Sequence, residues 1–353
     1  MTKTKPALRT TMIPAPEILI LFVIFIALVF DFTNGFHDSA NSISTVVSTK
    51  VLSPRNAVVF AAFFNFIAVF GFGVAVANTI SKTIKLDYVP ADVVPWIILS
   101  ALSGAIIWNI ITWIIGLPTS SSHALIGGLM GAGLSAAGIA AIQWSTVELV
   151  LTFMVLSPLI GLSVGFLFMA VVLWLTRSTQ KATADHYFKK LQLCSAAAYS
   201  FSHGTNDAQK TMGIITPLLF SIGYYGATVD PHNLPVPTWV ILICYGAIAL
   251  GTLSGGWRIV KTMGYKITRL RPVHGFAAET ASAGTIIGAS MLGIPVSTTQ
   301  IICASIMGVG STTGTSAVKW GVARSIMWAW IFTIPISAVI GFLVFYGLRV
   351  VAS

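Results

Sequence analysis

The sequence predicts an all-α polytopic membrane protein built from two inverted-topology repeats of about five crossings each. Of its 353 residues, 56% are hydrophobic and 8% are charged, whereas a soluble domain carries about 25% charged residues. Apolar runs of about 18 residues or more recur along the chain, as they do in membrane-spanning helices. Two motifs of the first half also recur, in the same order, in the second half.

About ten apolar crossings are expected, with boundaries accurate to a few residues. They lie near 16–49, 56–80, 91–115, 120–141, 146–176, 191–226, 239–257, 275–292, 297–313 and 325–349. The first and sixth are long enough to contain a break. The fourth and ninth are short and rich in Gly and Ser, so hairpin-like segments that re-enter are an alternative to simple spans. No small-residue cleavage site follows the first run, which therefore indicates a first span rather than a signal peptide.

Basic residues set the expected orientation, because cytoplasmic loops are enriched in Lys and Arg. With both termini outside, these loops hold thirteen of the 20 basic residues: Lys50, Arg55, Arg177, Lys181, Lys189, Lys190, Arg258, Lys261, Lys266, Arg269, Arg271, Lys319 and Arg324. The basic amino-terminal tail is the main evidence against this orientation. We therefore expect a multi-pass protein of the plasma (inner) membrane with both termini outside. Topology and anionic lipid explain the net charge of +10 better than a nucleic-acid partner does.

An internal repeat defines the architecture. The segment GLPTSSSHALIGGLMGAG (116–133) aligns without gaps with GIPVSTTQIICASIMGVG (293–310), with six of eighteen positions identical. FTNGFHDSANS (32–42) likewise matches FSHGTNDAQKT (201–211). The expected units are residues 1–185 and 186–353. Five crossings per unit is an odd number, so the two units must be inverted, as in secondary transporters that bind substrate near the midplane.

Asp38 and Asp207 occupy equivalent positions of the two repeats, deep in apolar segments. An ionisable residue inside a membrane costs roughly 2.5–3.5 kcal/mol on insertion scales and is usually functional. The alternative is an ion pair between Asp207 and Lys210 with a helix cap at Asp38. Gly35 and Gly204 precede the aspartates by three residues. They predict unwound helix, whose carbonyls bind a cation and whose amides bind an anion, although glycine also packs helices.

Two hydroxyl clusters follow Pro118 and Pro295, which are expected to begin helices. The clusters comprise Ser120, Ser121 and Ser122, and Ser297, Thr298 and Thr299. In a first helical turn, hydroxyls and free amides favour an anion. Two such helix starts brought together by inverted symmetry predict a cage for one small oxyanion. N-capping and tight packing by small residues are the alternatives.

The two features together predict symport. Two aspartates would repel an anion unless they first bound protons or cations, so binding of one ion would favour the other. Seven further residues are candidate accessory groups: His37, His123, His203, Gln209, Lys210, Gln300 and Glu279. The histidines could relay protons or be structural. No cofactor or metal-ligand set is assigned, because the three cysteines lie at no metal-ligand spacing.

These motifs resemble the inorganic phosphate transporter (PiT) family. NGFHDSAN and SHGTNDAQK look like its two signatures, and GLPTSSSH and GIPVSTTQ look like its two hairpin motifs. The resemblance implies an inverted-repeat carrier. It implies that the coupling ion binds Asp38, Asn41, Asn206 and Asp207, with Asn34 beside them. It also implies that phosphate binds both aspartates and the hydroxyls of Ser120, Ser121, Ser122, Ser297, Thr298 and Thr299.

The chain departs from the family pattern in two places. Gln300 stands where many members have His, and the long central loop of some members is missing. The "HD" form of the first signature resembles the proton-coupled, metal-phosphate branch, so protons are favoured over sodium.

The expected function is therefore import of inorganic phosphate, alone or as a metal-phosphate complex, by secondary active symport with protons or sodium. Phosphate, a coupling cation and the lipid bilayer are the expected partners, and a homodimer is left open. The first alternative is a permease for sulfate or another tetrahedral oxyanion. A channel or a membrane enzyme is less favoured, since the chain has no Gly-x-Ser-x-Gly elbow or metal motif.

Overall fold

A computed structural model of the chain describes residues 17–71, 73–226, 229–230 and 233–352. Its regular structure is helical, and these residues form no β-strand. The first six helices are α1 (Glu17–Ser48), α2 (Pro54–Ile67), α3 (Ala75–Ser81), α4 (Val94–Ile115), α5 (Ser121–Ala137) and α6 (Trp144–Leu175). The last six are α7 (Lys181–Ser221), α8 (Thr238–Ser254), α9 (Trp257–Tyr265), α10 (Pro272–Met291), α11 (Thr298–Ser311) and α12 (Trp320–Ala352).

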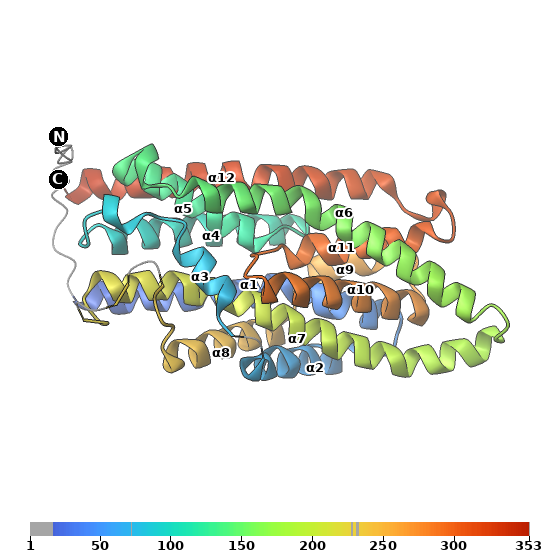
Figure 1. Cartoon of the computed structure of the whole chain (residues 1–353). Coiled ribbons are helices and arrows are strands. Elements are labelled where there is room, and N and C mark those ends of the chain that lie inside the picture. The colour runs from blue at the N-terminus through green and yellow to red at the C-terminus, as the bar shows by residue number, and fades with distance from the viewer. Residues whose placement is uncertain (1–16, 72, 227–228, 231–232, 353) are drawn as a thin grey trace.

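The long helices run side by side along the axis of one bundle (Figure 1). Within the described ranges, α1, α4, α6 and α12 are long and apolar enough to cross a membrane. The number rises to six when two bent pairs are counted as spans, namely α2 with α3, bent by 86°, and α8 with α9, bent by 71°. Each of the ten predicted apolar segments contains helix. The fold is that of a polytopic membrane protein.

The helices of the second half follow the same order as those of the first. Each half begins with a long helix, continues with a bent pair and a pair of helices joined by a short turn, and ends with a long helix. In Figure 1, α1 and α7 run in opposite directions along the bundle, as do α6 and α12. The start of α1 and the end of α12 lie at the same end (Figure 1).

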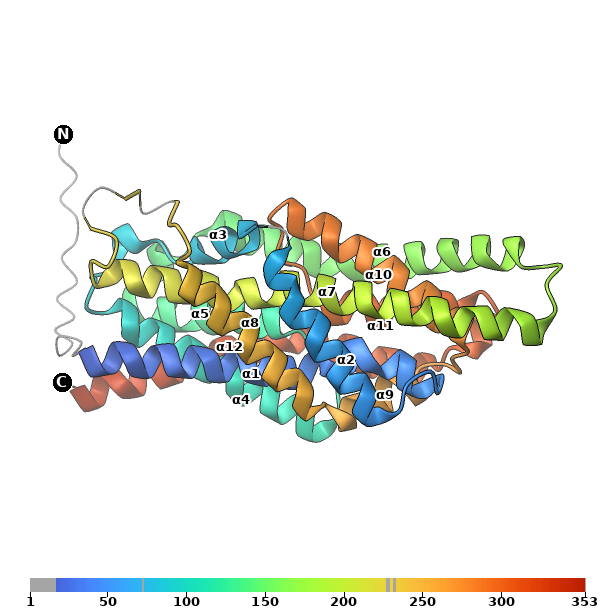
Figure 2. The same cartoon turned by 90° about the horizontal axis from the view of Figure 1, so that it is seen from below.

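The halves are interleaved rather than separate. Helix α5 packs on α12 and α11 packs on α6, while α1 packs on α8 and α7 packs on α2. The boundary expected between residues 185 and 186 falls within α7, which continues unbroken from Lys181. At one end of the bundle, α6 and α7 extend together beyond the other helices (Figure 1, Figure 2).

Helices α4 and α5 form one hairpin, and α10 and α11 form another. Gly116 ends α4 in the left-handed conformation, with φ 76°, and Gly293 has φ 69° at the equivalent turn. At about 1.5 Å per residue, the 17 residues of α5 and the 14 of α11 fall short of a hydrocarbon core of about 30 Å. The hydroxyl of Ser122 donates to the carbonyl of Val296 at 3.2 Å, so the two hairpin tips touch.

The predicted breaks in the first and sixth segments are wrong. Helices α1 and α7 continue through Gly35 and Gly204 without unwinding. These glycines allow close helix packing instead. A Cβ at Gly35 would lie 2.1 Å from the carbonyl oxygen of Ile248 on α8, and one at Gly204 would lie 2.5 Å from that of Asn65 on α2. The breaks occur at the junctions of the bent pairs.

Two apolar clusters lie on either side of the middle of the bundle. Along α1, Phe30 belongs to one cluster and Ile43 to the other. Along α7, Met212 belongs to the same cluster as Phe30, and Tyr199 belongs to the same cluster as Ile43. The polar residues between these positions are therefore sealed by apolar packing in both directions.

Candidate functional site

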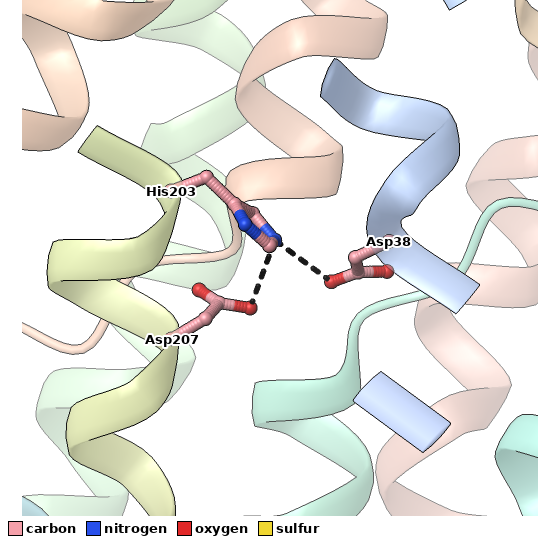
Figure 3. A group of neighbouring side chains, drawn as sticks. All are labelled: Asp38, His203 and Asp207. Atoms are coloured by element: carbon pink, nitrogen blue, oxygen red, sulfur yellow. Dashed lines mark ion pairs between the residues drawn. The ribbon is translucent and has the colours of Figure 1, made fainter. Parts of the chain in front are cut away.

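Asp38 on α1 and Asp207 on α7 lie at the centre of this sealed region. Their side chains are 1% and 0% exposed. The imidazole of His203, one turn before Asp207, lies between the two carboxylates (Figure 3). Its Nε2 is 3.5 Å from Asp207 Oδ2 and 3.9 Å from Asp38 Oδ2. The two equivalent aspartates of the sequence repeat thus share one site.

Asp38 contacts both hairpin tips. The hydroxyl of Ser121 at the start of α5 donates to Asp38 Oδ2, and that of Thr299 at the start of α11 donates to Oδ1, each at 3.3 Å. Asn41, one turn further along α1, donates from Nδ2 to the Thr299 hydroxyl at 2.9 Å. A single carboxylate therefore bridges two hairpins that come from different halves of the chain.

His37 is the second partner of Asp38. Its Nδ1 lies 2.8 Å from Asp38 Oδ1. Its Nε2 faces the hydroxyls of Thr112, at 3.3 Å, and Thr119, at 3.4 Å. Neither threonine was predicted from the sequence. Thr119 follows Pro118 directly, within the hydroxyl-rich motif, whereas no local pattern marks Thr112.

Asp207 has a different environment from Asp38. The ammonium of Lys210 on the same helix lies 2.6 Å from Asp207 Oδ1, and Asn34 on α1 donates to Oδ2 at 3.3 Å. The predicted ion pair is therefore present. Asp31, two turns before Asp38, is also fully buried and lies within electrostatic range of Asp207 and Lys210.

Two predicted residues of the second signature turn away from the carboxylates. Asn206 donates from Nδ2 to the hydroxyl of Ser290 on α10 at 2.9 Å. Gln209 accepts from the backbone N–H groups of Val76 and Ala77 at 2.8 and 3.2 Å, so it caps the start of α3. Both link α7 to neighbouring elements, and Ser290 had no sequence signal.

The hydroxyl clusters divide into caps and first-turn residues. Ser120 and Ser297 are the N-caps, and their hydroxyls accept from the backbone N–H of His123 at 3.3 Å and of Gln300 at 3.2 Å. The prediction that Pro118 and Pro295 begin the helices is therefore wrong. The helices begin one residue after the capping serines, because the capping residue itself must be extended. Pro118 instead accepts from Trp330 Nε1 at 2.9 Å.

The first-turn residues have the groups that an anion needs. Ser121, Ser122, Thr298 and Thr299 are all buried, at helix ends whose first amides and dipole favour negative charge. Several buried polar atoms around them make no hydrogen bond within the described part of the chain, namely Asn34 Oδ1, Asn41 Oδ1, His123 Nδ1, Thr298 Oγ1 and Gln300 Oε1. Buried polar atoms are normally paired, so this concentration of unpaired atoms indicates a ligand site.

Glu279 on α10 forms a separate polar cluster. Thr45 on α1 donates to it at 2.5 Å, Gln192 on α7 donates at 3.2 Å, and the Ser195 hydroxyl donates as well. Thr45 lies about two turns beyond Asp38 on α1. Glu279 therefore joins three helices beside the site.

Asp38, His203 and Asp207 present three ligand atoms within 4.8 Å of one another. Two carboxylates and an imidazole suit a cation. However, the Lys210 ammonium already contacts Asp207, so this donor set does not fit a resident divalent metal, and we assign none.

A polar centre with ionisable groups, sealed inside an apolar helical bundle, is typical of proteins that carry ions or solutes across membranes. A membrane transporter is the class of protein that this fold and site define. The model of a phosphate transporter family matches residues 34–341, and the chain belongs to that family. The predicted resemblance is confirmed, and the membrane-enzyme alternative is excluded because the family consists of transporters.

Similar proteins agree with this assignment. A probable low-affinity inorganic phosphate transporter of Rhizobium meliloti is 51% identical over 95% of this chain and 98% of its own length. The protein of the same description from Bacillus subtilis is 42% identical with the same coverage. A solved structure of a sodium-dependent phosphate transporter matches with a TM-score of 0.84 and 25% identity, over 95% of this chain and all of that one.

Proposed function

We propose that this protein imports inorganic phosphate across the plasma membrane by symport with a cation. Phosphate would bind between the two hairpin tips beside Asp38. The observation that carries this proposal is the convergence of Ser121 and Thr299, from different hairpins, on the Asp38 carboxylate at 3.3 Å. A ligand that displaces these contacts gains two hydroxyl donors and two helix N-termini.

The acceptor at Asp38 favours phosphate over sulfate. A protonated phosphate can donate a hydrogen bond to a carboxylate, whereas sulfate has no proton to donate. The same four first-turn hydroxyls could bind either tetrahedral anion. The phosphate transporters among the relatives support the first choice, and a sulfate permease remains the second candidate.

Charge compensation supports cation coupling. Asp207 has the ammonium of Lys210, but Asp38 contacts no Lys or Arg within the described ranges. An anion brought beside an ionised, buried Asp38 would be strongly unfavourable unless a cation came with it. The nearest groups to Asp38, apart from hydroxyls, are the imidazoles of His37 and His203. Nitrogen neighbours favour a proton, whereas hard cations prefer oxygen ligands.

The arrangement of the helices supports alternating access by two inverted units, residues 1–185 and 186–353. Equivalent long helices run in opposite directions (Figure 1), and the hairpin tips meet at the site. The burial of both aspartates between two apolar clusters supports an occluded state of such a carrier. The excess of Lys and Arg in the predicted cytoplasmic loops supports an orientation with both termini outside.

The test is uptake of radiolabelled phosphate into liposomes that contain the purified protein. An inward proton gradient should drive saturable uptake that excess sulfate leaves unchanged, and Asp38→Asn should abolish the gradient-driven part. Uptake that requires sodium would identify sodium, rather than the proton, as the coupling ion. Uptake that requires a divalent metal would indicate that a metal-phosphate complex is the transported substrate. Block by sulfate without phosphate entry would instead favour the sulfate permease.

A further inference from the structure

We propose that Lys210 is a built-in cation of the site. Its ammonium would take the place of one coupling cation at Asp207, so that only Asp38 must take a cation from solution with each phosphate. This inference rests on the proposed symport and concerns how many ions that symport needs.

The two repeats differ in charge at the position one turn after each aspartate. The residue three positions after Asp38 is Asn41, and the residue three positions after Asp207 is Lys210. Asn41 donates its amide to the hairpin hydroxyl of Thr299 at 2.9 Å and leaves Asp38 without a fixed cation. At the equivalent position of α7, the Lys210 ammonium lies 2.6 Å from the Asp207 carboxylate.

The charge of Lys210 matters because the residue and its partner Asp207 are both buried. Lys210 and Asp207 are both 0% exposed. A buried carboxylate must be compensated by a positive charge or by hydrogen bonds. Asp31 is the other buried carboxylate near the ammonium. Thr211 and Cys244 are close enough to interact with Asp31, but no described donor makes a well-formed hydrogen bond to its oxygens. Within the described part of the chain, Lys210 is therefore the only Lys or Arg side chain that contacts Asp207.

A tethered ammonium differs from a dissolved ion in what it contributes to transport. It neutralises Asp207 in every state of the carrier and never leaves with the phosphate. The number of cations taken up per phosphate is therefore lower than two equivalent aspartates would suggest. A purely structural ion pair would affect stability and would not change that number.

The experiment measures phosphate binding to the purified, full-length protein across a series of sodium concentrations and pH values. The slope of log Kd against log cation concentration gives the number of cations bound together with phosphate. Lys210→Asn copies the residue of the other repeat and should steepen this slope by about one unit. The double variant Asp207→Asn with Lys210→Asn removes carboxylate and ammonium together, so the phosphate binding that it retains, at whatever Kd, should show the wild-type slope.

If Lys210→Asn folds too poorly for a binding titration, its unfolding temperature provides a second measurement. Sodium or protons should raise the unfolding temperature of Lys210→Asn more than that of the wild type or the double variant, because the cation stabilises only the state that binds it. An unchanged slope in Lys210→Asn would overturn the proposal that Lys210 is a built-in cation. Loss of phosphate binding by this variant at every sodium concentration and pH would overturn it too. Absence of phosphate binding by the wild type would instead overturn the proposed function.

Discussion

The hydroxyl of Thr262 on α9 donates a hydrogen bond to the carbonyl of Gly116, at the turn of the first hairpin, at 2.8 Å. An equivalent bond of 2.7 Å joins Thr79 on α3 to Gly293, at the turn of the second hairpin. Each short helix thus holds the hairpin of the opposite half. The first contact is reinforced by Arg258, whose Nη1 donates to the carbonyl of Ile114 at 2.8 Å.

Thr262→Val should loosen only the first hairpin, and Thr79→Val only the second. Each substitution keeps the shape and removes a bond of about 1 kcal/mol, which corresponds to a change of about fivefold in a local opening equilibrium. Hydrogen–deuterium exchange should rise in 116–137 for Thr262→Val and in 293–311 for Thr79→Val. The two variants serve as controls for each other. An equal rise of exchange in both hairpins would contradict the conclusion that each short helix holds only the hairpin of the opposite half.

Asp38→Asn and Asp207→Asn should have different consequences for folding. Asn at position 38 can still accept from one of the hydroxyls of Ser121 and Thr299 through its oxygen and donate to the other through its amide N–H, so the protein should fold but lose coupled uptake. Asn at position 207 leaves the Lys210 ammonium buried and unpaired, and breaking a buried pair costs about 3–5 kcal/mol. Thermal unfolding in detergent should therefore show a clearly larger loss for Asp207→Asn. Equal unfolding temperatures would show that Lys210 finds compensation elsewhere, with Asp31 the nearest candidate.

The duplication of motifs indicated which residues lie together, because it marked Asp38, Asp207 and both hydroxyl clusters without any knowledge of packing. The difference between the two aspartates was indicated by the local sequence instead, because Lys210 follows Asp207 by one turn whereas Asn41 follows Asp38. The glycine prediction, in contrast, was wrong. Gly35 is compatible with unwinding or with close packing, and the partner that decides, Ile248, lies in the other half of the chain.

The helix starts show a similar limit at the scale of one residue. A run of three hydroxyl residues offers three candidate caps, and only the geometry shows that Ser120 and Ser297 accept from the third residue beyond them. Of the remaining hydroxyls, Ser121 and Thr299 donate to Asp38, whereas that of Thr298 makes no hydrogen bond within the described part of the chain.

Ser121→Ala combined with Thr299→Val should weaken phosphate binding more than it weakens the fold. A hydrogen bond to a charged group is worth about 1.5–3 kcal/mol, so loss of two donors should raise the Kd at least about tenfold. Ser120→Ala combined with Ser297→Ala should show the reverse pattern, because each lost cap costs about 1 kcal/mol of stability. Isothermal titration with phosphate and thermal unfolding of the same samples separate the two effects. A larger Kd change in the cap variant would place the anion at the caps.

Gly35→Ala and Gly204→Ala should prevent normal assembly of the bundle. The added Cβ atoms would lie 2.1 Å and 2.5 Å from backbone oxygens of neighbouring helices, and backbone cannot move aside as the end of a flexible side chain can. Overpacking of this kind costs about 1–3 kcal/mol or more.

Gly246→Ala, on α8, is the matched control, since no atom of another element lies within 4 Å of its added Cβ. It should be neutral or stabilising by up to about 1 kcal/mol through helix propensity. Size-exclusion profiles and unfolding temperatures of the three variants decide the point. If Gly35→Ala were as stable as Gly246→Ala, α1 and α8 would have to lie further apart than in this structure.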